Sequence, residues 1–207
     1  MHLIREEVTK KIPIKRKGTK YVARAASHVT NSVPVVIAVR DMLHFARTSA
    51  EVKHMIHTKL LKINGRLVRD LNESIKLFNI FEADKQYVLK LLPTGRFTFV
   101  ETKDSKRVCK VISKRLLPKS KIQLNLHDGS NVIGKKDISV GDSIYLDFSS
   151  KILSHKILEK GAKVFIISGK YTGSEGSISE ISGKNVTVKL EGGSANLLQD
   201  AVLVLWI

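Results

Sequence analysis

The sequence predicts an α+β fold that is mostly β: a helix pair plus a small sheet, then a central β-barrel, then a small C-terminal β-barrel. Three observations predict it. Apolar residues recur at helical spacing between residues 36 and 57. Asn64-Gly65 then lies among alternating apolar residues, which is the strongest short-range signal for a β-hairpin. Beyond Pro93, short β-rich runs are separated by turn signals such as His127-Asp128-Gly129.

Positive charge is concentrated in the first three-quarters of the chain. The 36 Lys and Arg residues exceed the 19 Asp and Glu residues, which gives a net charge of +17. Residues 1–28 contribute +6, residues 36–92 +4 and residues 93–156 +7, whereas residues 29–35 and 157–207 add nothing. A general need for solubility would spread the lysines more evenly, so this distribution indicates contact with a polyanion and favours nucleic acid.

Few features of the sequence point to other kinds of partner. The single cysteine, Cys109, cannot form an internal disulfide, which fits a reducing cytosol. No apolar run approaches the roughly 18 residues that a membrane span requires. His54 and His57 have no third ligand nearby, and the glycines of residues 169–176 do not precede a helix as phosphate-binding glycines do. We expect a cytoplasmic protein with no metal, no cofactor, no membrane partner and no small-molecule substrate.

Residues 1–35 form a basic N-terminal extension. It has few large apolar groups and no sustained period, so it cannot offset its own conformational entropy, and Pro13 and Gly18 argue against a continuous helix. We expect an extended arm that becomes ordered only against a partner. Its candidate RNA-binding residues are Lys10, Lys11, Lys15, Arg16, Lys17, Lys20 and Arg24.

Residues 36–92 are expected to form a helix pair that leads into a small sheet. A first helix begins near Val36, with Ser32 as a possible cap and Pro34 in its first turn, and places Arg40 and Arg47 on one face. Thr48-Ser49-Ala50-Glu51 is a capping box that opens a second helix. Short strands then occupy residues 61–68, around the Asn-Gly turn, and residues 75–92.

Two β domains complete the chain, a central one over residues 93–155 and a terminal one over residues 156–207. The central domain contains a basic cluster without acidic residues, which predicts an edge that faces phosphates. Asp128 and Asp142 are interpreted as turn residues. The cluster consists of Lys106, Arg107, Lys110, Lys114, Arg115, Lys119 and Lys121. The neutral charge of the terminal domain leaves contacts through its backbone, contacts through Lys170 or Tyr171, or packing against protein.

Three ordered stretches resemble one family. Residues 33–43 (VPVVIAVRDML), 46–48 (ART) and 61–70 (LKINGRLVRD) are similar to small-subunit ribosomal protein four of the archaeal and eukaryotic type, as is the arm sequence PIKRKGTKYV at 13–22. Residues 160–181 resemble the KOW motif, although Thr172 replaces its usual basic residue, and the arm lacks the family's tryptophan. The resemblance implies that residues 36–92 are a helix-hairpin RNA-binding domain, followed by a central β-barrel and a terminal KOW domain. It also implies a structural constituent of the ribosome that binds small-subunit rRNA and neighbouring ribosomal proteins. It places RNA contacts at Arg40, Arg47, Lys53, Lys62, Arg66 and Arg69.

Two alternatives belong to other functional classes. An RNA-modifying enzyme would need a catalytic constellation in a sizeable α/β domain, whereas residues 93–207 predict small β modules. A transcription elongation factor with a KOW module would need a polymerase-binding domain before that module, where this chain has a basic β domain. We therefore expect no enzymatic activity.

Overall fold

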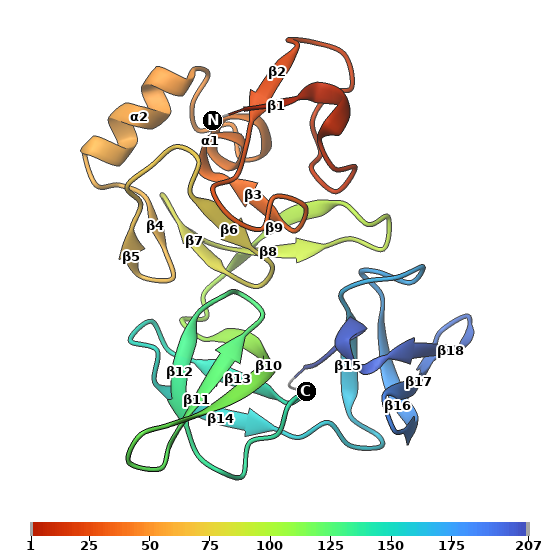
Figure 1. Ribbon diagram of the computed structural model, residues 1–207. Coiled ribbons are helices and arrows are strands. Elements are labelled where there is room, and N and C mark those ends of the chain that lie inside the picture. The colour runs from red at the N-terminus through yellow and green to blue at the C-terminus, as the bar shows by residue number, and fades with distance from the viewer. Residues whose placement is uncertain (1, 206–207) are drawn as a thin grey trace. The chain divides into compact units, whose positions relative to one another are not determined.

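The computed structural model describes residues 2–205, and these fall into two compact units, residues 2–105 and residues 106–205 (Figure 1). Both units are mostly β, as the sequence predicts.

The first unit combines a five-stranded antiparallel sheet with two short strand pairs. The sheet order is β5-β4-β7-β8-β9, and the pairs are β1-β2 and β3-β6. The strands are β1 His2–Ile4, β2 Tyr21–Ala23, β3 Ser32–Pro34, β4 Lys62–Ile63, β5 Arg66–Leu67, β6 Ser74–Lys76, β7 Ile80–Glu82, β8 Gln86–Leu91 and β9 Phe97–Thr102.

The first predicted helix is shorter than its apolar spacing suggested. A single turn, α1 (Val35–Ile37), runs into a π-helical turn at Ala38–Met42, and His44 then takes a positive φ of 58°. The capping prediction was wrong, because the Ser32 hydroxyl donates to the carbonyls of Ser27 and His28 at 2.9 Å, and Pro34 ends β3. Arg40 and Arg47 therefore do not lie on one helical face.

The second predicted helix forms as α2 (Ser49–His57) and begins at the capping box. The Thr48 hydroxyl accepts the Glu51 N–H at 3.2 Å, and the Glu51 carboxylate accepts the Arg47 N–H at 2.7 Å. The first bond satisfies a donor that the first helical turn leaves free, and the second holds the residue before the N-cap against the helix. Within residues 2–205, no helix has the length and apolar character needed to cross a membrane.

The predicted hairpin forms β4 and β5. Asn64 (φ 51°) and Gly65 (φ 78°) both adopt the positive φ that this turn requires. The strand expected after Pro93 also forms, but it belongs to the first unit, because β9 pairs with β8 from Leu91↔Phe97 to Gln86↔Thr102. The expected domain boundary at residue 93 is thus a hairpin turn inside a sheet, and the division between compact units follows residue 105.

The N-terminal arm is folded onto the first unit, so the expectation that it orders only against a partner was wrong. β1 pairs with β2, and the side chains of Ile12, Val22 and Ala25 are buried. The Phe97 N–H of β9 donates to the Lys11 carbonyl at 2.7 Å. A few well-spaced apolar side chains and this backbone bond anchor a segment whose composition alone indicates disorder.

The second unit contains two five-stranded antiparallel sheets, with orders β12-β11-β10-β13-β14 and β18-β17-β16-β15-β19. The first has a core around Val111, Leu124 and Ile144, and the second around Val164, Val186 and Val188. The strands are β10 Arg107–Leu117, β11 Lys121–Leu126, β12 Asn131–Gly134, β13 Ser143–Leu146, β14 Ile152–Lys156, β15 Lys163–Ile166, β16 Glu175–Ser182, β17 Asn185–Leu190, β18 Gly193–Leu198 and β19 Val202–Val204.

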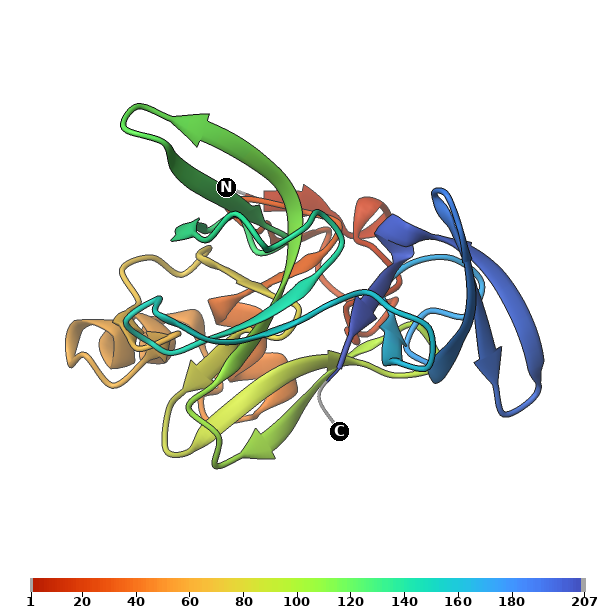
Figure 2. The ribbon, with the colours of Figure 1, turned by 90° about the horizontal axis from the view of Figure 1, so that it is seen from below.

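The β10-β11 hairpin extends away from the rest of its unit (Figure 2).

The turn role of Asp142 is confirmed. Its carboxylate accepts the Ser139 N–H at 2.7 Å and the Leu158 N–H at 3.0 Å, and contacts His155 Nε2 at 2.7 Å. The apolar end of the sequence, residues 201–207, forms β19 within the described part of the chain, and residues 206–207 lie outside it.

Glycines of the last sheet serve two different purposes. Gly169 and Gly173 have positive φ values of 96° and 87° in the turn between β15 and β16. Gly176 instead permits close approach of two strands, since a Cβ there would lie 2.6 Å from the Lys189 carbonyl oxygen of β17. Any larger residue at Gly176 would push β16 and β17 apart.

Candidate nucleic-acid interface

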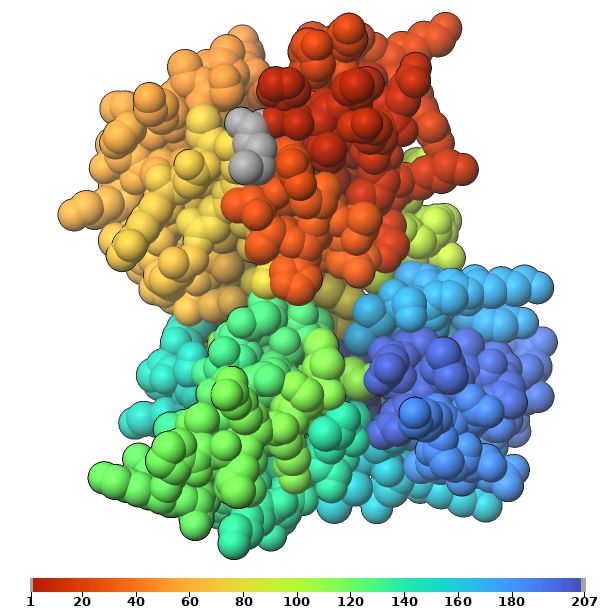
Figure 3. Space-filling model, in the orientation of Figure 1, coloured from red at the N-terminus to blue at the C-terminus, as the bar shows by residue number. Residues whose placement is uncertain are grey.

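The arm contributes a broad part of the surface of the first unit (Figure 3, red and orange), and most of its cations are exposed. Within it lies a cavity of about 390 Å³ between the start of the arm and the β8-β9 turn. Six of its thirteen lining residues are cationic, and none carries a carboxylate. The cationic residues are Arg5, Lys10, Lys11, Lys15, Arg16 and Arg96. We call this cavity the arm pocket.

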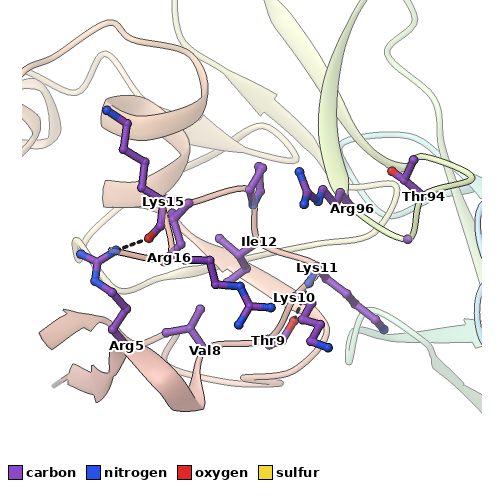
Figure 4. Close-up of a pocket in the computed structure, with 13 residues that line it drawn as sticks. Arg5, Val8, Thr9, Lys10, Lys11, Ile12, Lys15, Arg16, Thr94 and Arg96 are labelled. Carbon is purple, nitrogen blue, oxygen red and sulfur yellow. Dashed lines mark hydrogen bonds between the residues drawn. The ribbon is translucent and has the colours of Figure 1, made fainter. Parts of the chain in front are cut away.

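The side chains of the arm pocket have different orientations (Figure 4). The guanidinium groups of Arg16 and Arg96 turn toward the space between the arm and the β8-β9 turn, whereas the Lys15 ammonium points away from it. The Lys11 ammonium is bonded to the Asn31 amide oxygen, and burial lowers the pKa of Lys11. Arg16 and Arg96 are therefore the two groups best placed to receive an anion.

Arg5 holds the arm loop in place. Its Nε donates to the Thr19 carbonyl at 2.6 Å, Nη1 to the Lys15 carbonyl at 2.5 Å and Nη2 to the Thr19 hydroxyl at 3.0 Å. One planar guanidinium thus fastens both ends of the segment that contains Arg16 and Lys17. The remaining predicted arm cations, Lys17, Lys20 and Arg24, are exposed outside the pocket.

A second basic region lies between the end of α2 and the β4-β5 hairpin. A groove of about 520 Å³ there is lined by His57, Lys59, Arg66 and Arg69, together with Ile56, Leu67 and Val68. Arg66 is ion-paired with Glu73 yet keeps 64% of its side chain exposed. The Glu73 carboxylate also accepts the Arg69 N–H at 3.1 Å, which fixes the backbone just after the hairpin. The structure therefore brings Arg66 and Arg69 together, as the hairpin spacing suggests.

The other predicted residues of the first unit lie apart from this groove. The Arg40 guanidinium binds the neighbouring Asp41 carboxylate at 2.8 Å, and this hydrogen bond raises the pKa of Arg40. Lys62 lies 3.9 Å from Glu82. Arg47 and Lys53 are exposed.

Two residues of the predicted basic cluster in the second unit are not at the surface. Arg107 is 5% exposed and forms an ion pair with the buried Asp128, and Lys110 is 3% exposed. The Lys110 ammonium donates to the carbonyls of Gln199 at 2.5 Å and Val202 at 2.7 Å. Burial lowers the pKa of Lys110 to about 8. Both side chains face the interior, so their assignment as phosphate contacts was wrong.

The turn interpretation of Asp128 is confirmed, and its carboxylate is in addition the ion-pair partner of Arg107. Its carboxylate accepts the N–H and the hydroxyl of Ser130 at 2.8 and 2.6 Å. Although burial opposes ionisation, the Ser130 hydrogen bonds and the Arg107 charge lower the pKa of Asp128. The adjacent Cys109 thiol is buried, and burial raises its pKa, so it is not activated as a nucleophile.

The remaining cations of the second unit are accessible along the β10-β11 hairpin and in one terminal loop. Lys106, Arg115, Lys119 and Lys121 are exposed, and Lys114 is half-buried with its ammonium on the Lys136 carbonyl at 3.1 Å. Lys170 is exposed, with its ammonium 5.8 Å from the centre of the Tyr171 ring.

Sequence reasoning missed three basic residues that the fold adds to these regions. Arg5 and Arg96 line the arm pocket, and Lys59 lines the groove beside α2. Arg96 follows Pro93-Thr94-Gly95 and was assigned to the wrong domain, so its proximity to the arm was hidden. The signal that could have found it is the turn itself, which folds β9 back along β8.

Comparisons with known proteins match both units of the chain. The model of ribosomal family S4e matches residues 83–153, and the KOW motif matches residues 160–191. The small ribosomal subunit protein eS4 of Methanocella arvoryzae is 31% identical over 188 residues, covering 87% of this chain and 80% of that protein. The protein of the same name from Halobacterium salinarum is 30% identical and covers 99% of this chain and 94% of its own length.

A solved structure agrees with these matches. The crystal structure of the 30S ribosomal protein S4e from Thermoplasma acidophilum aligns with a TM-score of 0.72 and 26% identity, over 84% of this chain and 95% of that one. These matches define the class of this mostly β chain, which is that of the ribosomal proteins. The chain belongs to the family of small ribosomal subunit protein eS4.

Proposed function

We propose that the chain binds small-subunit rRNA chiefly through the two basic regions of its first unit, the arm pocket and the groove between α2 and the β4-β5 hairpin. As a member of the eS4 family, it is a structural constituent of the small subunit of the cytoplasmic ribosome and not an enzyme. Its partners in that assembly are rRNA and other ribosomal proteins. The observation that supports the proposed interface is the gathering of Arg16, Arg96, Arg66 and Arg69 into two cation-lined hollows.

The mechanism of this binding is electrostatic docking. Lysines and arginines neutralise backbone phosphates and release counterions, which makes the affinity fall steeply as salt rises. A-form RNA offers its backbone and 2′-hydroxyls rather than its base edges, so shape dominates over sequence. The exposed cations Lys17, Lys20, Arg24, Arg47 and Lys53 would extend the contact beyond the two hollows.

We further propose that each region of the chain has its own role. Residues 1–35 serve as a folded basic extension, and residues 36–105 as a helix-hairpin RNA-binding domain. Residues 106–156 form a small central barrel whose β10-β11 hairpin supplies Lys106, Lys114 and Arg115, and residues 157–205 form a KOW-like barrel. The last region contributes Lys170 and packs mainly against protein.

Charge reversal at Arg69, which lines the groove, and at Arg47, an exposed arginine just before α2, tests whether the first unit carries the RNA interface. We expect the double variant Arg47→Glu/Arg69→Glu to lose incorporation into small subunits, because both side chains would then repel phosphates. The readout is co-sedimentation of the tagged protein with small subunits at low and high salt.

The matched control is Lys184→Glu/Lys189→Glu, which makes the same charge change at exposed positions of the neutral C-terminal sheet. Circular dichroism checks that both variants fold. Normal incorporation of the Arg47/Arg69 variant, or equal loss in the control, would contradict the placement of the interface on the first unit.

A further inference from the structure

The arm pocket has a charge arrangement that the protein itself does not balance. Six cationic residues line about 390 Å³, and no lining residue is Asp or Glu. Arg5 and Lys11 use their donors on Thr19, Lys15 and Asn31, and Lys15 points away. That leaves the Arg16 and Arg96 guanidinium groups, with Lys10 beside them, facing a space that holds no carboxylate of the chain.

Arg16 and Arg96 reach this space from segments eighty residues apart in the sequence. The Arg16 loop is fixed by Arg5, and the Arg96 backbone is fixed because its carbonyl accepts the Leu92 N–H at 2.8 Å in the β8-β9 turn. The bond from Phe97 N–H to the Lys11 carbonyl joins the two segments at 2.7 Å. The backbone segments that carry the two side chains are thus held together before any ligand arrives.

We infer that the arm pocket is a binding site for a phosphate of the RNA backbone, clamped between Arg16 and Arg96, with Arg5 as the positioning residue for the Arg16 loop. The inference rests on the proposed function and assigns one phosphate contact within it. Arginine presents a planar fork that matches phosphate oxygens, and two forks from different directions can enclose one group. An acidic peptide offers carboxylates spaced along a neutral backbone, whereas an RNA strand also reaches the exposed cations Lys17 and Lys20 beside the pocket.

The decisive experiment compares four forms of the full chain in binding to small-subunit rRNA across a salt series. Arg96→Gln removes one fork, and Arg96→Lys keeps the charge without the fork. Lys90→Gln is the matched control, because Lys90 is exposed on β8, in the same sheet but outside the pocket. We expect about a tenfold weaker affinity for Arg96→Gln, an intermediate loss for Arg96→Lys and a change within about twofold for Lys90→Gln.

The salt dependence of the affinity and the thermal stability of the free variant distinguish the loss of a direct phosphate contact from a folding defect. Arg96→Gln should flatten the plot of log affinity against log salt by about one unit, as loss of one phosphate contact does. Thermal unfolding of the free variant should match the wild type. If Arg96→Gln behaves like Lys90→Gln, the clamp is refuted while the proposed function stands; if the wild-type chain itself does not bind rRNA, the proposed function fails first.

Two further measurements identify the source of the phosphate. Inorganic phosphate, at constant ionic strength, should raise the melting temperature of the wild type more than that of Arg16→Gln/Arg96→Gln if the pocket accepts a single phosphate group. Polyglutamate should compete with rRNA for the wild type far less than an RNA strand of equal charge does. Equal competition by polyglutamate would overturn the assignment to RNA.

Discussion

The arm and strand β10 are both dense in basic residues, yet the fold uses their charges in opposite ways. Arg16, Lys17 and Lys20 of the arm are exposed. In β10, Arg107 and Lys110 are buried and bonded inside the second unit. A cluster of cations in the sequence therefore indicates an RNA-binding surface only where the fold leaves those side chains exposed.

The partners in β10 come from distant positions, which is why the sequence does not reveal them. Asp128 lies 21 residues beyond Arg107, and the carbonyl of Val202 lies 92 residues beyond Lys110. A buried charge must keep its partners, because removing one leaves a desolvated ion uncompensated. The exposed arm cations Arg16, Lys17 and Lys20 stay in water and carry no such requirement.

Neutralising Asp128 should have the largest effect. In Asp128→Asn, the Arg107 guanidinium remains buried without a carboxylate, so we expect the free energy of unfolding to fall by about 3 kcal/mol or more. Urea unfolding of the full chain measures this change. Asp137→Asn removes an exposed carboxylate from the same unit as the control, and an equal effect in the two variants would show that the buried pair is not required.

Lys110 should make stability depend on pH in an unusual direction. Burial lowers its pKa from 10.5 to about 8 in the folded protein. Between these values the unfolded chain binds more protons than the folded one, so the stabilising contribution of Lys110 rises with pH, by about 1.4 kcal/mol per unit of pKa shift when complete.

Lys110→Met tests this pH dependence. We expect wild-type stability, measured by urea unfolding and taken relative to the variant, to increase from pH 7.5 to pH 9.5. Titration of other groups cancels in that difference. A flat difference across this range would mean that the folded protein does not release the Lys110 proton there.

An exposed cation of the same strand should show the smallest effect on stability. Arg115 lies near the tip of the β10-β11 hairpin. Arg115→Gln should change the free energy of unfolding by no more than about 0.5 kcal/mol, while lowering the salt slope of rRNA binding by somewhat under one unit. A large loss of stability would show that Arg115 is required for the fold, as Arg107 and Lys110 are, and would contradict the difference between exposed and buried cations of β10.

The parts of the fold that depend on local chemistry were predictable. Asn64-Gly65 specifies its hairpin because both residues tolerate positive φ, and Thr48 specifies the start of α2 because its hydroxyl satisfies a free N–H. β18 (Gly193–Leu198) was missed, since its Gly, Ser and Asn residues have weak β-propensity and its pairing with β17 supplies the order.

The candidate site was predictable in its charge and not in its assembly. The sequence identified Arg66 and Arg69 through the hairpin and the arm cations through their density. It could not identify Arg96, because the bond between the Phe97 N–H and the Lys11 carbonyl brings Arg96 to the arm. It could not exclude Arg107 either, because strand pairing brings Asp128 to that side chain. Contacts between distant segments decide both cases.

The anchoring of the arm by the Phe97 N–H and the Lys11 carbonyl, above the buried Ile12 and Val22, has a thermodynamic consequence. An unstructured tail gives up roughly 1–2 kcal/mol of backbone entropy for every residue fixed on association. This arm has already met that cost during its own folding, so its encounter with RNA is the docking of a preorganised surface. Its charges can therefore contribute to affinity without the loss that coupled folding entails.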